Sequence, residues 1–264
     1  MKLSIVTISF NAEKCIERTI LSILNQDKPV YEYIIVDGGS SDQTMKIVNS
    51  YKNEFLKKGI KFIAISETDK GISDAFNKGI KLSTGDLIGL VNADDELMNT
   101  ANKVLEDVFE KDIDVYYGNC IWEDSQNNLR YVSKPKEIKS SKLNRLLYEM
   151  VMIHPSTFIA KKAYLKNGLY DTSFRYCMDQ ELLYRMYKNG ASFKYVDTEF
   201  TKFKSGGVSD SNPRKVFAET ARIPLMNGES KKKVFFITQK KLIRDYLARK
   251  AKKVGLYHLI KRQI

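Results

Sequence analysis

The chain has 264 residues, of which 43% are hydrophobic and 29% are charged, so it is long enough to bury a sizeable core. Its apolar runs stay far short of the roughly 18 residues that span a bilayer, and we expect neither a membrane span nor a secreted protein. The three cysteines, Cys15, Cys120 and Cys177, are odd in number and form no C-x-x-C pair. This pattern argues against a disulfide framework and a zinc ribbon, and predicts reduced, mostly buried thiols.

The net charge of +12 is concentrated near the C-terminal end of the chain. Residues 201–264 contain 17 Lys and Arg against 4 Asp and Glu, whereas the first 200 residues contain 27 against 28. A DNA-binding domain usually carries its cations on the folded body, where they meet the phosphates of a groove. The charge distribution therefore argues against nucleic acid as a partner.

Apolar runs rich in β-formers alternate with segments of helical period along the first 91 residues. The predicted strands are residues 2–8, 33–36, 61–65 and 87–91, and the predicted helices are residues 13–25, 42–57 and 72–82. Continuously hydrophobic strands are typical of a parallel sheet that helices cover on both faces. The first half is thus a Rossmann-like α/β unit, in which ligands bind at the carboxyl ends of the strands.

The second half predicts a different succession of elements. We expect helices at residues 100–110, 141–150 and 179–189, and strands at residues 115–122, 129–133, 157–159 and 192–196, with a turn at residues 125–128. From residue 230 the chain is rich in lysine, and Ile243, Leu247, Val254 and Tyr257 recur at helical spacing. This spacing predicts a basic amphipathic helix, interrupted near Gly255.

Polar and acidic clusters follow all four N-terminal strands, at residues 9–11, 37–39, 67–69 and 92–95. The first strand lacks the G-x-G-x-x-G of dinucleotide-binding proteins, and the chain contains no P-loop motif. Asp37 is able to accept hydrogen bonds from a base or ribose, and the oxygen-rich Asn92-Ala93-Asp94-Asp95 suits Mg²⁺ or Mn²⁺, which neutralises a diphosphate. Taken singly, each cluster also fits an ordinary turn or helix cap.

Four segments together carry a family resemblance: TISFNAEKCIERTILSILNQ, IIVDGGSSDQT, SETDKGISDAFNKGIKLSTGDLIGLVNADD and HPSTFIAKKAYLKNGLYDTSFRYCMDQELLYRM. In this order and spacing, from residue 2 to about residue 207, the chain resembles the family 2 inverting glycosyltransferases of the GT-A fold, in the branch that acts in bacterial polysaccharide assembly. The resemblance implies a Rossmann-like mixed sheet flanked by helices over residues 1–210. Residues 1–98 are then the nucleotide-binding half and residues 99–210 the acceptor-binding half, followed by a basic helical extension at 211–264.

The resemblance also implies a nucleotide-sugar donor, most often a UDP-sugar, and a divalent cation, Mn²⁺ or Mg²⁺. Asp37 is expected to hold the uracil or ribose and Asp94 to ligate the cation, while Asn92 stands where the family more often has an acidic residue. The full expected donor set is Thr7, Ser9, Asn11, Asp37, Asp69, Asp74, Lys78, Asn92, Ala93 and Asp94.

By the same resemblance, Asp179 is the catalytic base, which takes a proton from the acceptor hydroxyl. From its position alone, Asp179 also fits a helix-capping acid stabilised by the helix dipole. The family often has Glu immediately before this base, where this chain has Met178. His154 is expected near the acceptor or diphosphate, or else as a structural imidazole. Lys202 and Lys204 are expected on a loop at residues 202–209 that closes over the donor, with an ordinary surface loop as the alternative.

The processive members of the family carry Q-x-x-R-W and membrane spans, both missing from this sequence, so we expect single sugar addition. The basic C-terminal segment predicts docking on an anionic membrane surface, which fits a lipid-linked or saccharide acceptor and a cytoplasmic, peripheral location on the inner face of the plasma membrane. The alternative for this segment is a helix that packs on the body.

Two other functions are alternatives to sugar transfer. A catalytically silent nucleotide-sugar-binding subunit is favoured by Met178 and Asn92, whereas a sugar nucleotidyltransferase lacks its phosphate loop here.

Overall fold

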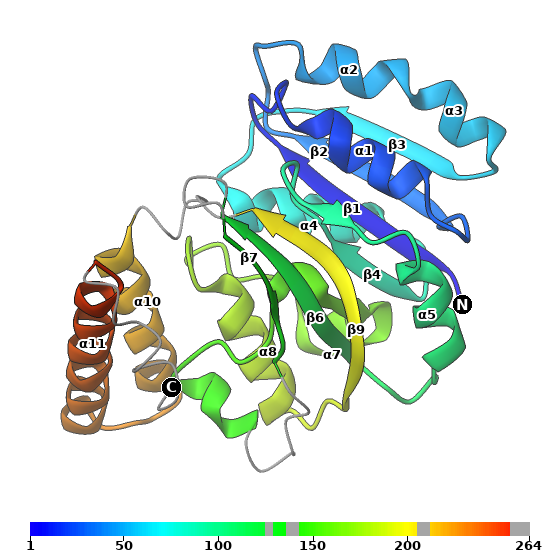
Figure 1. Ribbon diagram of the computed structural model, residues 1–264. Helices are drawn as coiled ribbons and strands as arrows, with labels where there is room; N and C mark the ends of the chain where they lie inside the picture. The colour runs from blue at the N-terminus through cyan, green and yellow to red at the C-terminus, as the bar shows by residue number, and fades with distance from the viewer. Residues whose placement is uncertain (125–128, 136–142, 205–211, 254–264) are drawn as a thin grey trace. The chain divides into compact units, whose positions relative to one another are not determined.

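Parallel strands form one side of a mixed sheet in the computed structural model, which describes residues 1–124, 129–135, 143–204 and 212–253 (Figure 1). The N-terminal elements are β1 (Leu3–Ser9), α1 (Ile16–Leu24), β2 (Glu32–Asp37), α2 (Thr44–Ser50), α3 (Lys52–Lys57), β3 (Lys61–Ser66), α4 (Ile72–Leu82) and β4 (Leu87–Leu90). Strand β1 pairs in parallel with both β2 and β4, and β2 pairs in parallel with β3. This β-α-β succession confirms the predicted Rossmann-like unit.

On the far side of β4 the same sheet continues through antiparallel pairs and one parallel pair. The elements are β5 (Glu96–Leu97), α5 (Ala101–Val108), β6 (Val115–Asp124), β7 (Leu129–Ser133), η1 (Asn144–Leu147), η2 (His154–Ser156), β8 (Thr157–Ala160), α7 (Lys161–Asn167), α8 (Met178–Lys188) and β9 (Phe193–Lys204). Within the described part of the chain, the strand order is β3-β2-β1-β4-β8-β6-β9-β5, with β7 paired to β6, and the parallel pair is the one between β6 and β9. The sheet is therefore mixed, as predicted.

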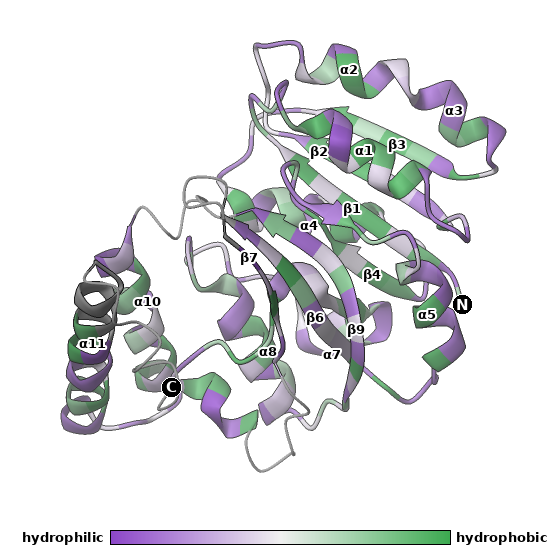
Figure 2. Ribbon diagram, viewed as in Figure 1, coloured by the Kyte–Doolittle hydropathy of each residue, from purple (hydrophilic) through white to green (hydrophobic). Residues whose placement is uncertain are grey.

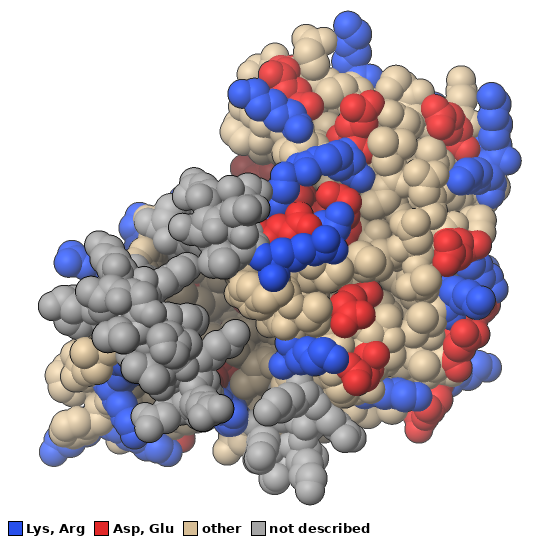
Figure 3. Space-filling model, viewed as in Figure 1, with Lys and Arg blue, Asp and Glu red and all other residues tan. Residues whose placement is uncertain are grey.

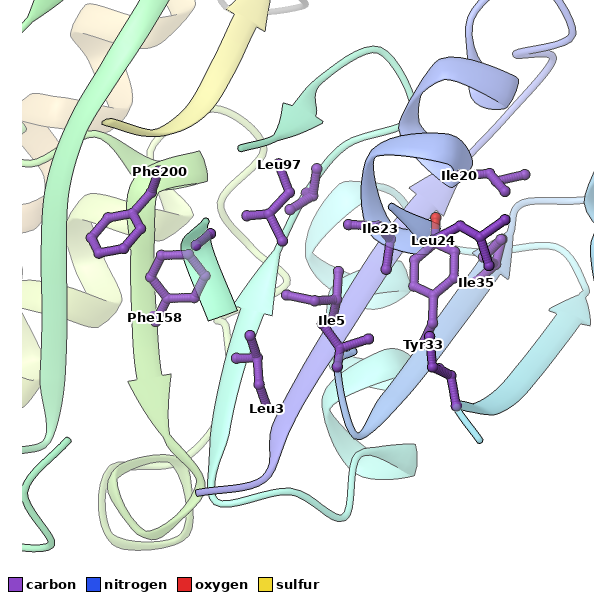
Figure 4. Close-up of a cluster of buried hydrophobic side chains, with 14 of the residues drawn as sticks. Leu3, Ile5, Ile20, Ile23, Leu24, Tyr33, Ile35, Leu97, Phe158 and Phe200 are labelled. Carbon is purple, nitrogen blue, oxygen red and sulfur yellow. The ribbon is translucent and has the colours of Figure 1, made fainter. Parts of the chain in front are cut away.

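Helices cover the parallel strands on both faces, which explains why these strands are continuously hydrophobic. Leu3 and Ile5 belong to a buried cluster with Ile20 and Ile23 of α1, whereas α4 packs against β1 on the other face (Figure 4). At Gly79 of α4, an added Cβ would lie 2.2 Å from a methyl carbon of Val6, so only glycine allows this close approach. In Figure 2 hydrophobic residues predominate along the parallel strands, whereas hydrophilic and hydrophobic residues alternate along α2 and α3. Each such buried aliphatic side chain contributes about 1.5–3 kcal/mol to folding.

Two predicted element boundaries are wrong. The helix expected over residues 42–57 is divided into α2 and α3 at Tyr51, which follows Asn49 and Ser50, both weak helix formers. The Tyr51 hydroxyl donates a 2.6 Å hydrogen bond to Glu17, which holds the break against α1. The strand expected over residues 192–196 continues to Lys204 because β9 pairs with β6 and then with β5.

Some short elements were not predicted, and some predictions lie outside the described residues. Strand β5 has two residues, and α7 follows β8 directly, so neither produces a readable period. The helix predicted over residues 141–150 is wrong in length and type: Asn144–Leu147 form the short 3₁₀ helix η1, and residues 148–150 are not helical. Residues 141 and 142 lie outside the described ranges. The predicted turn at residues 125–128 also lies outside them.

The structure divides into two compact units, Met1–Ser211 and Asn212–Ile264. The second unit contains α10 (Pro213–Met226), which lies within the helical extension expected at residues 211–264 but was not predicted as a separate helix. It also contains α11 (Lys231–Lys253), at the position of the basic helix expected from residue 230. In α11, Val234 is buried whereas Phe236 and Ile243 are exposed, so its apolar residues are not confined to one stripe. Val254, Gly255 and Tyr257 lie outside the described residues. Among the helices that are described, none is long and apolar enough to cross a bilayer.

Candidate functional site

A cavity of about 570 Å³ opens at the carboxyl ends of the parallel strands, where the sequence places its polar clusters. Ser9 ends β1, Phe10 and Asn11 follow it, and Gly38 follows β2. The remaining lining residues include Asp69 after β3, three residues after β4 and one residue from the second half: Asn92, Ala93, Asp94 and Arg175. The predicted position of the ligand site in this sheet is thus matched by a cavity.

Hydrogen bonds between loops hold the first wall of this cavity in place. Asn11 has a positive φ of 48°, a conformation that asparagine tolerates better than most residues. Its side-chain oxygen accepts a 3.0 Å hydrogen bond from the Ser41 amide, and its own amide donates to the Ser40 hydroxyl at 2.7 Å. These contacts connect the loop after β1 to the loop after β2, so the wall is formed before any ligand binds.

Asp37 lies behind the cavity and organises the loop that follows β2. Its buried carboxylate accepts hydrogen bonds from the hydroxyls of Ser9, Ser40 and Ser66 at 2.9, 2.5 and 2.7 Å, and from the amides of Gly39 and Ser40. Burial by itself would raise the pKa of Asp37, but these hydrogen bonds together hold the pKa below its ordinary value. The carboxylate is ionised and its acceptor sites are directed at the protein.

Three other residues of the expected donor set also lie outside the lining of the cavity. Thr7 is buried and accepts a 3.1 Å hydrogen bond from the Tyr33 hydroxyl. Lys78 forms a 2.8 Å ion pair with Glu67 and donates to the carbonyl of Thr68 at 2.9 Å, and Asp74 lies 3.7 Å from the same ammonium group. Lys78 therefore supports the loop after β3 from behind, while Asp69 lies in the cavity wall.

The turn after β4 presents Asp94 to solvent and buries Asp95. The Thr19 hydroxyl is within hydrogen-bond distance of the carbonyls of Ala93 and Asp95, at 2.8 and 2.7 Å, which ties the turn to α1. The side-chain amide of Asn92 donates to Asp95 at 3.1 Å. Burial, with the nearby charge of Asp94, raises the pKa of Asp95 to about 8, so Asp95 is mostly protonated at neutral pH. Asp94 is the exposed carboxylate of this turn.

The turn offers a divalent cation two oxygen donors. The amide nitrogen of Asn92 is engaged with Asp95, which leaves its carbonyl oxygen as an acceptor beside the Asp94 carboxylate. The described residues contain no cluster of three or more His, Cys, Asp or Glu side chains with metal-binding geometry. Mg²⁺ in proteins is often held by one or two carboxylates and takes its other oxygens from substrate phosphates and water. The donor set fits a cation that is shared with a bound diphosphate.

A second cavity, of about 400 Å³, adjoins the first and shares Asn92 and Asp94 with it. Asp179 lines this second cavity from the first turn of α8, and its carboxylate accepts a 2.8 Å hydrogen bond from the Gln180 amide. A helix N-terminus stabilises an ionised carboxylate. Much of the remaining lining is apolar or aromatic, and it includes Phe76, Trp122, Met152, Tyr176, Met178 and Phe203.

His154 lies in the same cavity as Asp179. Its Nε2 is 3.0 Å from the Tyr170 hydroxyl, and its ring packs against Phe76 with centroids 5.5 Å apart. Burial lowers the pKa of His154, and the nearby Asp179 carboxylate opposes this shift only in part. The imidazole is therefore neutral at pH 7.

The lysines expected on a closing loop lie on strand β9 instead, so the predicted loop is wrong for residues 202–204. Lys202 pairs with Glu96 at 3.1 Å and lines neither cavity, because its side chain points toward β5. Lys204 lines the second cavity, and its amide lies 3.4 Å from the Asp95 carboxylate. Residues 205–209 lie outside the described part of the chain.

Arg175 is a cavity residue that the sequence analysis did not identify. Two contacts with α4 position its segment: Ser73 donates to the carbonyl of Phe174 at 2.9 Å, and the side chain of Asn77 donates to the carbonyl of Tyr170 at 2.9 Å. The sequence signal for Arg175 is weak: it is an arginine between two aromatic residues, Phe174 and Tyr176. Its place beside Asp69 and Asp94 depends on packing between segments about 100 residues apart in the chain.

On the face seen in Figure 3, acidic and basic side chains are interspersed over the first unit, without the continuous cationic stripe typical of a nucleic-acid groove.

Comparison with known proteins agrees with this architecture. The family model described as glycosyl transferase family 2 matches residues 4–169. A PGL/p-HBAD biosynthesis glycosyltransferase of Mycobacterium tuberculosis is 27% identical over 227 residues, which cover 84% of this chain and 84% of the relative. A GalNAc(5)-diNAcBac-PP-undecaprenol beta-1,3-glucosyltransferase of Campylobacter jejuni is 27% identical over 188 residues, 71% of this chain and 60% of the relative.

Solved structures extend the similarity to the fold. TarS 1-349 of S. aureus in complex with UDP-GlcNAc superposes with a TM-score of 0.67 at 20% identity, over 96% of this chain and 73% of that one. The mannosyltransferase PcManGT of Pyrobaculum calidifontis, in complex with GDP-Man and Mn²⁺, superposes with a TM-score of 0.65 at 13% identity, over 91% and 68%. At this level of identity the superpositions bear on the fold, and they confirm the predicted GT-A architecture.

Proposed function

Because this chain belongs to glycosyl transferase family 2 and is a glycosyltransferase, we propose that it moves one sugar from a UDP-sugar to a lipid-linked or saccharide acceptor, with inversion, in cell-surface polysaccharide biosynthesis. Residues 1–98 supply most of the donor site and residues 99–210 most of the acceptor site. The relative from C. jejuni, whose name refers to a saccharide linked to PP-undecaprenol, supports this class of acceptor.

One observation carries the proposal: two adjoining cavities meet at Asn92 and Asp94. The first is bounded by strand-end loops of the Rossmann-like unit, where nucleotides bind in such sheets. The second contains Asp179. A donor whose diphosphate lies beside Asp94 has its anomeric carbon at the junction, within reach of an acceptor in the second cavity.

In the donor cavity, Phe10 offers an exposed aromatic face on which a base is able to stack. Asp69 accepts a 2.7 Å hydrogen bond from the Gly71 amide through one oxygen, which leaves the other oxygen at the cavity wall for the base or ribose. Arg175 contributes a cation for the diphosphate. A divalent cation on Asp94, Mn²⁺ or Mg²⁺, supplies Lewis-acid stabilisation of the leaving diphosphate when it is bound.

In the acceptor cavity, Asp179 removes the proton from the attacking hydroxyl. The acceptor oxygen forms its bond to the anomeric carbon as the bond from that carbon to the diphosphate breaks on the opposite face. This geometry inverts the anomeric configuration and releases UDP. A positioned carboxylate base contributes about 10²–10⁴ to such a rate. Neutral His154, held by Tyr170, shapes the wall beside Asp179 without adding positive charge there.

The second unit supports docking on an anionic membrane surface, which fits a cytoplasmic, peripheral protein with a lipid-linked acceptor. Helix α11 exposes Phe235 and Phe236 next to its lysine-rich start at residues 231–233. Apolar side chains enter the interface while each cation near an anionic surface contributes about 1 kcal/mol. Co-sedimentation with phosphatidylglycerol vesicles tests this part, and equal binding to neutral phosphatidylcholine vesicles contradicts it.

The whole proposal is tested by calorimetry and UDP release with UDP-glucose, UDP-galactose, UDP-N-acetylglucosamine, UDP-N-acetylgalactosamine and UDP-glucuronate, each with and without Mn²⁺. Metal-dependent binding and slow UDP release from one donor are expected. Binding of a donor without release, even when lipid-linked acceptors are added, instead favours a catalytically silent subunit. Met178 directly precedes Asp179, and because the family resemblance leads one to expect Glu at this place, it is the sequence feature that favours this second function.

A further inference from the structure

Three aromatic side chains form a row across β7, β6 and β9. Trp122 of β6 has Tyr131 of β7 as its register partner on one side and Phe203 of β9 on the other. The ring centroids of Trp122 and Phe203 are 4.5 Å apart, and those of Trp122 and Tyr131 are 6.1 Å apart with nearly parallel planes. Register partners on adjacent strands project from the same face of a sheet, so the three rings form one continuous surface, the aromatic row.

The aromatic row begins inside the acceptor cavity and continues beyond it. Trp122 and Phe203 line the cavity that contains Asp179, whereas Tyr131 lies outside that lining. Tyr131 is 46% exposed, so a large part of this side chain faces solvent. The proton transfer to Asp179 does not require the exposed ring of Tyr131 on β7, because only the acceptor hydroxyl has to reach the carboxylate.

The shape and polarity of the aromatic row fit a flat ligand with an apolar face and a polar edge. Pyranose rings have this character, because their axial C–H groups form apolar faces while hydroxyl groups surround the rim. Trp and Tyr combine a large apolar face with a hydrogen-bonding group, which suits such a ligand. An acyl chain would instead favour an enclosed apolar groove, and Tyr131 on β7 is open to solvent.

We propose that the aromatic row is an extended acceptor subsite, which binds the sugar that precedes the acceptor's terminal residue. The terminal sugar lies against Trp122 and Phe203, with its hydroxyl at Asp179, and the preceding sugar stacks on Tyr131. This inference rests on the proposed transferase function and narrows it, because the acceptor is then a saccharide chain of at least two sugars.

Trp122 is the single tryptophan of the chain, so its fluorescence reports directly on the aromatic row. The wild-type protein, with UDP and Mn²⁺ bound, is applied to a microarray of bacterial surface oligosaccharides and their component monosaccharides. The strongest oligosaccharide is then titrated in solution against the wild type and three variants. Tyr131→Ala removes the ring, Tyr131→Phe keeps it, and Val132→Ala is a matched control at the neighbouring exposed position of the same strand.

We expect oligosaccharides to be retained in preference to monosaccharides and to shift the Trp122 emission. Tyr131→Ala is expected to weaken oligosaccharide binding about tenfold, equivalent to about 1.4 kcal/mol. Tyr131→Phe and Val132→Ala are expected to bind like the wild type, and the thermal midpoints of all variants show whether they fold. Oligosaccharide binding by Tyr131→Ala equal to that of the wild type overturns the proposal. So does an array on which no oligosaccharide is retained, or on which the component monosaccharides are retained as strongly as the oligosaccharides.

Release of UDP from UDP-sugars, measured on the wild type without acceptor, separates this inference from the function on which it rests. If no donor is bound or hydrolysed, the transferase proposal fails, whatever the array shows. If a donor is hydrolysed but Tyr131→Ala has no effect on oligosaccharide binding, only the extended subsite fails.

Discussion

Asp94 and Asp179 line the same cavity, although Asp94 follows β4 and Asp179 lies in the first turn of α8, in the second half of the chain. Asp94 also lines the adjoining cavity, and Asp179 does not. The two carboxylates therefore have different surroundings, one beside the expected diphosphate and one beside the expected acceptor. This difference allows each role to be tested by its own substitution.

Replacing Asp179 with Asn is expected to lower the rate of sugar transfer by about 10²–10⁴, because the acceptor hydroxyl loses its proton acceptor. Binding of the donor is expected to be unchanged, since Asp179 lies outside the donor cavity. Steady-state transfer rates and UDP calorimetry check the two parts. Asp107→Asn, an exposed change on α5, is the matched control, and a transfer rate retained by Asp179→Asn contradicts the assignment.

Replacing Asp94 with Asn is expected to weaken UDP binding in the presence of Mn²⁺ by at least about tenfold, because the cation loses its carboxylate ligand. Binding measured in EDTA is expected to change little. The reverse change, Asn92→Asp, adds a carboxylate to the turn and is expected to increase the affinity for UDP in the presence of Mn²⁺. Titration of Mn²⁺ at constant UDP provides the measurement. An equal loss of UDP affinity with and without Mn²⁺ argues that Asp94 acts without a metal.

Gly38→Ala is expected to narrow the donor cavity. A Cβ at this position would lie 2.6 Å from a carboxylate oxygen of Asp69 and 3.3 Å from the Phe10 ring, so both side chains have to move. We expect UDP affinity to fall about tenfold, or about 1.4 kcal/mol, while the thermal midpoint changes little because the displaced groups are side-chain ends. Calorimetry and thermal unfolding of the same variant distinguish the two effects. Wild-type affinity for UDP would falsify the placement of the base beside Phe10.

Glu32 predicts a pH-dependent contribution to stability far from the site. Its buried carboxylate accepts hydrogen bonds from the hydroxyls of Ser4 and Thr84 at 2.6 and 2.8 Å and from Lys61 at 3.2 Å. Burial acts to raise the pKa of Glu32, but these hydrogen bonds outweigh it and lower the pKa below its ordinary value of 4.5. The stabilisation is therefore complete above pH 4.5 and is lost as the pH falls through the lower pKa of the folded state.

We accordingly expect Glu32→Gln to reduce the free energy of unfolding by about 2 kcal/mol at pH 7, and by less as the pH falls toward 3. Urea unfolding at both pH values measures the difference. The exposed Glu54→Gln on α3 serves as the control. A loss of stability that is independent of pH contradicts the electrostatic explanation and points to packing.

The sequence by itself was sufficient to determine the architecture and the edge of the sheet that carries the site. Strands β1, β2 and β4 are buried on both faces, which makes them continuously apolar and therefore recognisable. Polar and acidic residues follow each of these strands. They meet at one edge of the sheet, because parallel strands all end at the same edge. For the same reason Asn92 and Asp94 could be predicted to lie beside Ser9 and Asn11, and the structure brings these four residues into one cavity.

Only the tertiary structure decided which of the polar residues reach the cavity. Asp37 ends β2 and Asp69 follows β3. Hydrogen-bond donors from β1, β3 and the loop after β2 surround Asp37, whereas Asp69 lies in the cavity wall. Periodicity predicts the face of a strand on which a side chain lies. It does not reveal which donors other segments bring to that side chain.

The second half of the site depended most on contacts between distant segments. Arg175 enters the donor cavity because Ser73 and Asn77 of α4 hold the segment that precedes it. Lys202 forms an ion pair with Glu96 because β9 continues far enough to pair with β5. These positions follow from long-range hydrogen bonds and strand pairing, which local sequence patterns do not encode.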